Sequence, residues 1–167
     1  AKQGNQRAFQ LLYEANVFHL HRFMKQFSKN NAEVEDWVQR AFIKAYRGLP
    51  QFHGKSKFSS WLFRIAINEM QTDRRRMNVV SFVDSFDEGL KDSTNTADDF
   101  EWSATMKTYL DQLDDAKRMV FVLYEVEGYS HGEIASMLGF GESTSRTILS
   151  RTKQWLKKQW ETERRAS

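Results

Sequence analysis

Apolar side chains recur every three to four residues along most of this chain, the spacing that gathers them on one face of an α-helix. The clearest case lies between Ala32 and Leu49, where positions i, i+4, i+7 and i+11 are Val34, Val38, Ala41 and Ala45. A single proline and 8 glycines among 167 residues leave few points at which a helix must break. We therefore expect an all-α fold.

Further helices are predicted on both sides of this segment. Residues 5–27 form one helix or a helix pair, and Pro50 closes the helix that follows it. A polar loop at residues 51–60 ends in serines that are suited to capping a third helix, from near Trp61 to about Arg76.

Helical periodicity fades over residues 78–99, where Asp, Ser, Thr and Asn accumulate, and it resumes around Phe100. This change of composition is typical of a linker. We predict two small helical domains, at residues 1–78 and 101–167, joined by a flexible acidic linker at residues 79–100.

The formal net charge of +3 hides a strong segregation along the chain. Residues 1–80 carry 14 basic and 6 acidic side chains, whereas residues 81–101 carry 1 and 7. The last 25 residues, 143–167, hold 7 basic and 2 acidic side chains. Two basic surfaces on either side of an acidic stretch favour a polyanion partner held at two places. Charged residues that merely solvate helix faces are the alternative.

Several classes of protein are disfavoured by what the sequence lacks. It has no cysteine for disulfides or thiolate metal sites, no apolar run before a small-residue cleavage site in its first residues, and no apolar run near the ~18 residues that a membrane span needs. His19 and His21 are two apart and cannot face one metal ion from a helix. Neither a Gly-rich phosphate loop nor a nucleophile motif is present. We expect a cytoplasmic protein without enzymatic activity, cofactor, metal or small-molecule substrate.

The second half of the chain has the pattern of a helix-turn-helix. Ser130 and Glu133 form a capping-box pattern, Gly139 ends the short helix that follows, and Ser143 or Thr144 is placed to cap a long basic helix. The open face of that helix is predicted to carry Arg146, Ser150, Lys153 and Lys157, with Thr144, Ser145 and Thr147 near its N-terminus. In this motif the N-terminal part of the second helix enters the major groove of DNA. A helical hairpin with a merely solvated basic face is the alternative.

The third predicted helix, in the first half, is apolar around most of its circumference. One stripe stays polar, at Arg64, Asn68, Gln71 and Arg75, and it could follow a phosphate backbone or read a base edge. The loop before it interleaves aromatic and basic residues: Phe52, His53, Lys55, Lys57 and Phe58, followed by Trp61. Such loops hold unstacked bases, so single-stranded nucleic acid is a candidate ligand. For Phe58 and Trp61, packing in the core is the alternative.

A smaller polar set lies on the second predicted helix. Asp36, Gln39 and Arg40 fall opposite the apolar stripe, with Phe42 close by. Polar groups beside an aromatic ring form protein docking surfaces in some helices and are merely solvated in most.

Three segments together resemble the extracytoplasmic-function class of bacterial sigma factors, the small two-domain promoter-specificity subunits of RNA polymerase. They are NQRAFQLLYE, VEDWVQRAFIKAYRGLPQFHGKSKFSSWLFRIAINEMQTDRRR and LDQLDDAKRMVFVLYEVEGYSHGEIASMLGFGESTSRTILSRTKQWLKK. They occur in the family's order and cover nearly the whole chain except the acidic linker.

The resemblance implies roles for the first domain, which would be sigma domain 2. The D-x-x-Q-x-x-F pattern of Asp36, Gln39 and Phe42, with Arg40 beside it, looks like the helix that docks on the beta-prime clamp helices of core polymerase. The loop at residues 51–60 and the helix after it look like the elements that capture a flipped base and open the single-stranded −10 element. Backbone contacts would come from Arg74, Arg75 and Arg76.

The second domain would be sigma domain 4, with an apolar surface that faces the polymerase beta flap. Arg146, Thr147, Ser150 and Arg151, with Lys153, align with the helix that reads the duplex −35 element. Two departures lie there, because Ser145 stands where the family commonly has an apolar Val and Ile148 where it commonly has an Arg. The −35 contacts therefore cannot be copied from relatives.

The sequence thus predicts a sigma factor that binds core polymerase, recognises two promoter elements and opens one of them. A free-standing helix-turn-helix regulator that binds duplex operator DNA is the alternative. The resemblance also implies an anti-sigma partner, often one anchored in the inner membrane.

Overall fold

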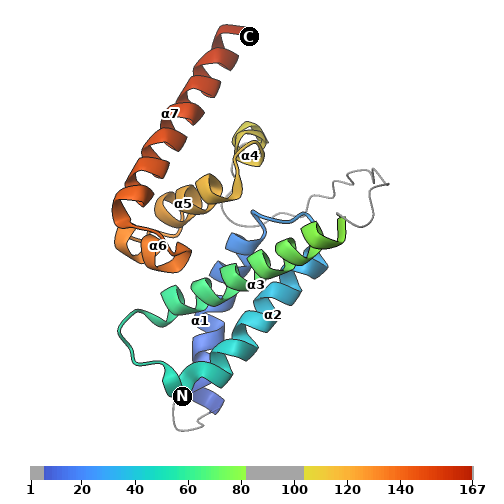
Figure 1. Cartoon of the computed structure of the whole chain (residues 1–167), viewed down its shortest axis with the longest axis vertical. Helices are drawn as coiled ribbons and strands as arrows, with labels where there is room; N and C mark the ends of the chain where they lie inside the picture. Colours follow the sequence, from blue (N-terminus) through green and yellow to red (C-terminus); the bar gives the residue numbers. More distant parts are fainter. Residues whose placement is uncertain (1–5, 82–103, 167) are drawn as a thin grey trace. The chain divides into compact units, whose positions relative to one another are not determined.

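Every regular element of the computed structural model is helical, across the residues that it describes, 6–81 and 104–166 (Figure 1). The predicted all-α fold is confirmed. The described residues form two compact units, one within each range. No described helix is long and apolar enough to cross a membrane. Most of the predicted acidic linker, residues 82–100, lies outside the described residues.

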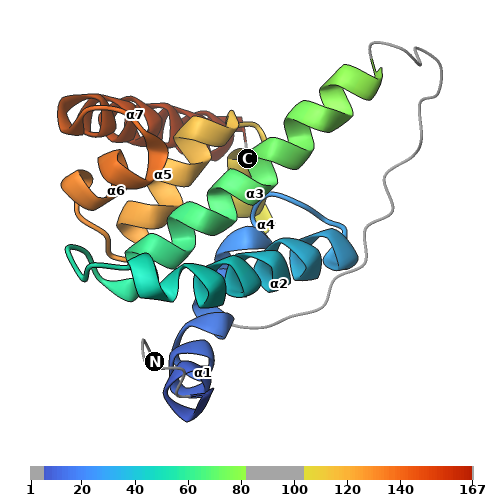
Figure 2. The same ribbon diagram turned by 60° about the horizontal axis from the view of Figure 1, so that its bottom comes forward.

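The first unit is built from three helices and one short turn. These are α1 (Gln6–Met24), α2 (Asn31–Gly48), the 3-10 turn η1 (Leu49–Gln51) and α3 (Phe58–Ser81). The middle helix α2 packs against both α1 and α3, as the two views show (Figures 1 and 2). One side of α2 therefore faces α1, and another side faces α3.

The apolar stripe predicted on α2 does face the core. Val34, Val38, Ala41 and Ala45 are all buried, and Trp37 is buried beside them. Their partners on the neighbouring helices are also buried, namely Leu20, Phe23 and Met24 on α1, and Leu62, Phe63, Ala66, Ile67 and Met70 on α3. Burial of this apolar surface is the main source of stability for so small a unit.

The third helix begins earlier than the sequence predicts. The Trp61 amide donates to the Lys57 carbonyl at 3.2 Å, so α3 begins at Phe58, and Ser59 lies inside its first turn rather than at its cap. The helix also continues past Arg76 to Ser81. The serines that suggested a cap occupy helical positions, so this expectation was wrong by about one turn.

The second unit contains α4 (Ala104–Asp111), α5 (Asp115–Glu125), α6 (His131–Leu138) and α7 (Glu142–Ala166). Both α5 and α6 pack on α7, whose C-terminal part extends beyond them (Figure 1). The pair α6–α7 is the predicted helix-turn-helix. The expected helix start near Phe100 lies outside the described residues.

The turns of this motif are fixed by local chemistry. Ser130 and Glu133 form the predicted capping box at the start of α6. Gly139 ends α6 with φ 77°, the left-handed conformation that glycine adopts without steric cost. The next helix starts before Ser143, since the Ser145 amide donates to the Gly141 carbonyl at 3.2 Å. The predicted cap at Ser143 or Thr144 was therefore placed too late.

Candidate nucleic-acid and protein-docking surfaces

The predicted recognition face of α7 is exposed along its length. Thr144, Arg146, Thr147, Ser150, Arg151, Lys153 and Lys157 are all exposed. Arg146 forms an ion pair with Glu142 one turn earlier, and Lys153 pairs with Glu125 of α5 at 3.0 Å. Exposed ion pairs of this kind contribute little to stability, so both cations are available to exchange their carboxylate for a phosphate or a base.

Ser145 is the exception on this helix, and its assignment as a DNA contact needs correction. Its side chain is fully buried, on the same face as Leu149, Thr152 and Leu156, which are also buried. The spacing i, i+4, i+7 and i+11 places all four against the rest of the unit. Ser145 thus occupies an inward position, where the resembling family commonly has an apolar Val.

The buried hydroxyl group of Ser145 has a specific partner. His131 Nδ1, at the start of α6, lies 2.9 Å from Ser145 Oγ. The imidazole ring is in turn stacked on Tyr124 of α5, with centroids 4.5 Å apart. One polar contact therefore joins the two helices of the motif. The other departure, Ile148, is half-buried.

The polar stripe on α3 is confirmed as one exposed line. Arg64, Asn68 and Arg75 are exposed, and Gln71 between them is half-buried. Leu62, Phe63, Ala66, Ile67 and Met70 of the same helix are buried, so this line lies on the face that α3 presents to solvent. Its guanidinium and amide groups are the donors that contact phosphates and base edges.

The three consecutive arginines at the end of this line do not act alike. Arg75 and Arg76 are exposed. Arg74 is half-buried, and it donates a hydrogen bond to the carbonyl of Phe27, which follows α1. The predicted backbone contact by Arg74 therefore needs correction, because this side chain ties α3 to α1.

The aromatic residues of the loop form a cluster with one another. Phe52 is stacked on Trp61 with centroids 4.9 Å apart, and Phe58 meets both rings at an angle. A Cβ atom at Gly48 would come within 3.1 Å of the Trp61 ring, so the absence of a side chain there lets the indole lie against α2. All three rings are half-buried. Packing and an exposed aromatic surface are thus combined in the same side chains.

The basic residues of this loop adjoin the aromatic cluster in sequence. His53, Lys55 and Lys57 are exposed, and Gly54 between them has φ 68°. The loop therefore offers positive charge next to aromatic surface, as the sequence predicted.

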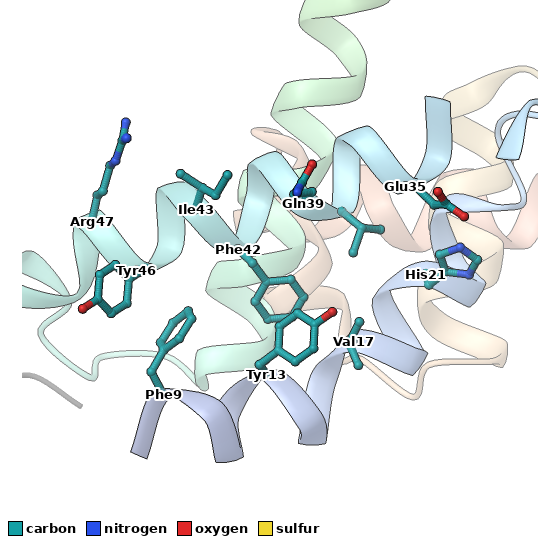
Figure 3. A pocket seen from close by; sticks show the side chains of 11 residues that line it. Phe9, Tyr13, Val17, His21, Glu35, Gln39, Phe42, Ile43, Tyr46 and Arg47 are labelled. Carbon is teal, nitrogen blue, oxygen red and sulfur yellow. The ribbon is translucent and has the colours of Figure 1, made fainter. Parts of the chain in front are cut away.

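A groove between α1 and α2 encloses about 890 Å³ (Figure 3). The rings of Phe9 and Tyr13 on α1 and of Phe42 on α2 gather inside it, and Gln39 and Ile43 lie along its edge. Further lining comes from Val17, His21, Glu35, Val38, Tyr46 and Arg47. Burial lowers the pKa of His21, with Lys25 acting in the same direction against Glu35, so this imidazole is harder to protonate than a free one.

Of the predicted docking residues, Gln39 and Phe42 line this groove, whereas Asp36 and Arg40 do not. Asp36 and Gln39 are exposed. Phe42 is buried, with its ring 4.6 Å from that of Tyr13, so it forms part of the groove rather than an open contact. Arg40 is half-buried between α2 and α3, where its hydrogen bond with Asp73 raises its own pKa and lowers that of the carboxyl group.

The sequence did not predict the groove itself. The exposed apolar side chains that line it are Tyr13, Ile43 and Tyr46. The spacing of Gln39, Ile43 and Tyr46 at i, i+4 and i+7 was a usable signal on α2. The contribution of α1 was not, because it depends on how the two helices pair.

Comparison with known proteins decides what these surfaces belong to. Residues 12–78 match the family described as Sigma-70 region 2, and residues 104–156 match the family described as Sigma-70, region 4. The RNA polymerase sigma-H factor of Pseudomonas aeruginosa is 31% identical, over 94% of this chain and 88% of that protein. The chain belongs to the sigma-70 family, in its extracytoplasmic-function class. This sigma factor directs core RNA polymerase to specific promoters and initiates transcription there.

Further comparisons support this family assignment. The ECF RNA polymerase sigma-E factor of Escherichia coli strain K12 is 32% identical, over 92% of the chain and 86% of that protein. A solved structure of the sigma factor RpoE from Bartonella quintana has the same fold, with a TM-score of 0.79 at 22% identity over 93% of this chain and 98% of that one. CnrH has a TM-score of 0.71 at 26% identity, covering 96% of this sigma factor and 92% of CnrH. A free-standing helix-turn-helix regulator would not account for the match to region 2.

Proposed function

We propose that this sigma factor divides its work among three surfaces. The groove between α1 and α2, together with exposed Asp36 and Gln39 on α2, docks on the beta-prime clamp helices of core polymerase. The exposed line on α3 and the aromatic loop before it hold the opening −10 strand. The open face of α7 reads the duplex −35 element. Residues 1–78 and 101–167 then act as sigma domains 2 and 4.

One observation carries the assignment of the −10 surface. Arg64, Asn68 and Arg75 form an exposed polar line on a helix that is otherwise packed into the core. Half-buried aromatic rings and exposed cations precede this line, and stacking on aromatic rings with phosphate contacts from cations is how proteins bind unpaired strands. The same surface would capture a flipped base, because a base leaves the duplex only if stacking is replaced.

Apolar area with a polar edge supports the docking assignment. Protein interfaces combine a buried apolar centre with a polar rim, and the groove has Tyr13, Ile43 and Tyr46 exposed beside Gln39. In the second unit, exposed Arg146, Thr147, Ser150 and Arg151 lie at the N-terminal half of α7, the half that enters a major groove. The apolar surface of that unit is then left for the beta flap.

An anti-sigma protein is the further partner that we propose. The solved structures of RpoE and CnrH hold these sigma factors in complex with the anti-sigma factor NepR and with the cytosolic domain of CnrY. A membrane-anchored anti-sigma protein would hold this chain inactive in the cytoplasm. The chain itself performs no covalent chemistry and takes no cofactor or small-molecule substrate.

Transcription with purified components tests the proposal. The protein is added to bacterial core polymerase on genomic DNA, and the transcripts are sequenced. We expect start sites that share two upstream elements, and Ile43→Asp should weaken core binding by about tenfold because it puts a charge into an apolar contact. Leu11→Asp is the matched control, since Leu11 is an exposed apolar residue of α1 outside the groove. Equal effects of both variants would contradict the docking assignment.

A further inference from the structure

A polar cluster joins the docking helix α2 to the strand-opening helix α3. The Asp73 carboxylate of α3 accepts hydrogen bonds from both terminal nitrogens of the Arg40 guanidinium, with Nη1 3.2 Å from Oδ1. It also accepts one from Trp37 Nε1 at 3.0 Å. Arg40 and Trp37 both belong to α2, so three hydrogen bonds to one carboxylate tie the two helices together.

Two further carboxylates share the same guanidinium. Asp36 of α2 lies 2.8 Å from Arg40 Nη2, and Glu69 of α3 lies 3.6 Å from Nη1. Glu69 is buried and is also paired with Lys44. A bidentate Arg–carboxylate pair fixes direction as well as distance, which a single point charge does not.

The position of the cluster along α3 indicates which part of the helix it holds in place. Met70 is the last buried apolar residue among the described side chains of α3, which reach Arg76. Beyond Met70 the helix is held by polar contacts, chiefly those of Asp73 and the bond from Arg74 to Phe27. This is the part of α3 that carries Arg75 and Arg76.

The cluster also lies on the opposite side of α3 from the exposed line. Glu69 and Asp73 face α2, whereas Asn68 and Arg75 are exposed. Each residue turns a helix by about 100°. A small roll of the second half of α3 on α2 would therefore move the exposed line away from the strand, and the contacts of Asp73 oppose such a roll.

Resting on the proposed function, we propose that Asp73 is a positioning residue for promoter opening, holding the end of α3 in register with the docking helix through Arg40 and Trp37. Because α2 is the helix proposed to dock on polymerase, these contacts fix the orientation of the strand-opening helix α3 relative to the docked surface.

The test compares Asp73→Asn with the wild type on two versions of one promoter found by transcript sequencing. One template is fully duplex and the other has its −10 element already unpaired. We expect about tenfold fewer transcripts from the duplex template, since hydrogen bonds to a charged group are lost. On the unpaired template the activity should return to within about twofold of the wild type, with core affinity unchanged.

A second variant of the same cluster and a control variant outside it show whether the effect is specific to the contacts of Asp73. Trp37→Phe removes the indole hydrogen bond and part of a buried ring but leaves both Arg40 contacts to Asp73 in place, so it should show a loss on the duplex template that the unpaired template rescues in the same way. Glu14→Gln, at an exposed carboxylate of α1, should have no effect.

The possible negative results distinguish failure of the positioning role from failure of the proposed function. Asp73→Asn activity equal to wild type on duplex DNA, or a loss that the unpaired template does not restore, overturns the positioning role alone. A wild-type protein inactive on both templates overturns the proposed function and this inference with it.

Discussion

Ser145 carries a hydroxyl group into a fully buried position of the recognition helix, and His131 is its partner at 2.9 Å. Removal of one partner leaves the other without its bond, at a typical cost of about 1 kcal/mol. We expect Ser145→Ala to lower the free energy of unfolding by about this amount, His131→Ala to lower it by more because it also removes the stack on Tyr124, and the double variant to lower it by less than their sum.

Chemical denaturation of the four proteins measures this coupling as a double-mutant cycle. Ser150→Ala is the control, because Ser150 is exposed on the same helix. Additive losses for Ser145 and His131 would show that the contact contributes nothing.

Asn68 lies in the middle of the exposed line of α3, between Arg64 and Arg75. Its amide offers both a donor and an acceptor, which suits a base edge better than a phosphate. We expect Asn68→Ala to change which −10 sequences are transcribed, with core affinity and the free energy of unfolding nearly unchanged, within about 0.5 kcal/mol. Competition between promoter variants measures the preference, with Thr72→Ala, exposed on the same helix, as control. Unaltered preference would remove Asn68 from the base-reading surface.

At the scale of residues, the spacing of apolar and polar side chains predicted which of them are buried, whereas the predicted DNA contacts of single residues were less reliable. The stripes on α2 and α3 were predicted by spacing, and their burial or exposure follows that spacing. Ser145 was assigned to DNA from its place near the N-terminus of the recognition helix, and Arg74 from the family resemblance. Both side chains instead bond within the protein, to His131 and to the Phe27 carbonyl, and sequence alone carries no signal for partners so distant.

The turn between α6 and α7 is an element whose geometry depends on one glycine. Gly139 has φ 77°, and a Cβ atom there would meet nothing within 4 Å, so the cost of a side chain comes from the backbone alone. We expect Gly139→Ala to lower the free energy of unfolding by about 1 kcal/mol.

Gly132 in the same short helix supplies the matched control. Its Cβ would make only an ordinary contact, 3.5 Å from Glu142 Oε2, and it lacks a positive φ. Gly132→Ala should therefore stabilise the protein by up to about 1 kcal/mol, because glycine is a poor helix former. Thermal unfolding of the two variants should give shifts of opposite sign, and shifts of the same sign would contradict this account of the turn.

The existence of the helices was predicted better than the residues at which they begin and the way in which they pack against one another. The helices of both units exist where apolar periodicity placed them, but α3 and α7 begin earlier than the serines suggested. Serines fit the first turn of a helix as well as its cap, so the sequence left the boundary open. The groove between α1 and α2 could not be read from either helix, because it is a property of their contact.

The whole molecule has an acid-sensitive carboxylate in each unit. In the first unit, the hydrogen bond from Arg40 holds the pKa of Asp73 below its usual value, with Trp37 contributing. In the second unit, burial raises the pKa of Asp114, but its hydrogen bonds with Lys117 outweigh this and lower it overall. Asp114 caps the start of α5, so both groups stabilise helix packing or helix ends.

The sign of the pH dependence follows from these shifts. An Asp in the unfolded chain titrates at about 3.9, and a lower value in the folded state means that the unfolded state binds the proton more tightly. The stabilisation is therefore complete above about pH 4 and is lost as the pH falls through the lowered pKa values.

We expect both units to lose stability on acidification, and Asp73→Asn to flatten the loss in the first unit only. Hydrogen exchange of peptides from α2 and α3, compared with those from α5 and α7, measures each unit at about pH 7 and about pH 3. An Asp73→Asn variant whose first unit shows the same acid loss as the wild type would contradict the Arg40–Asp73 pairing.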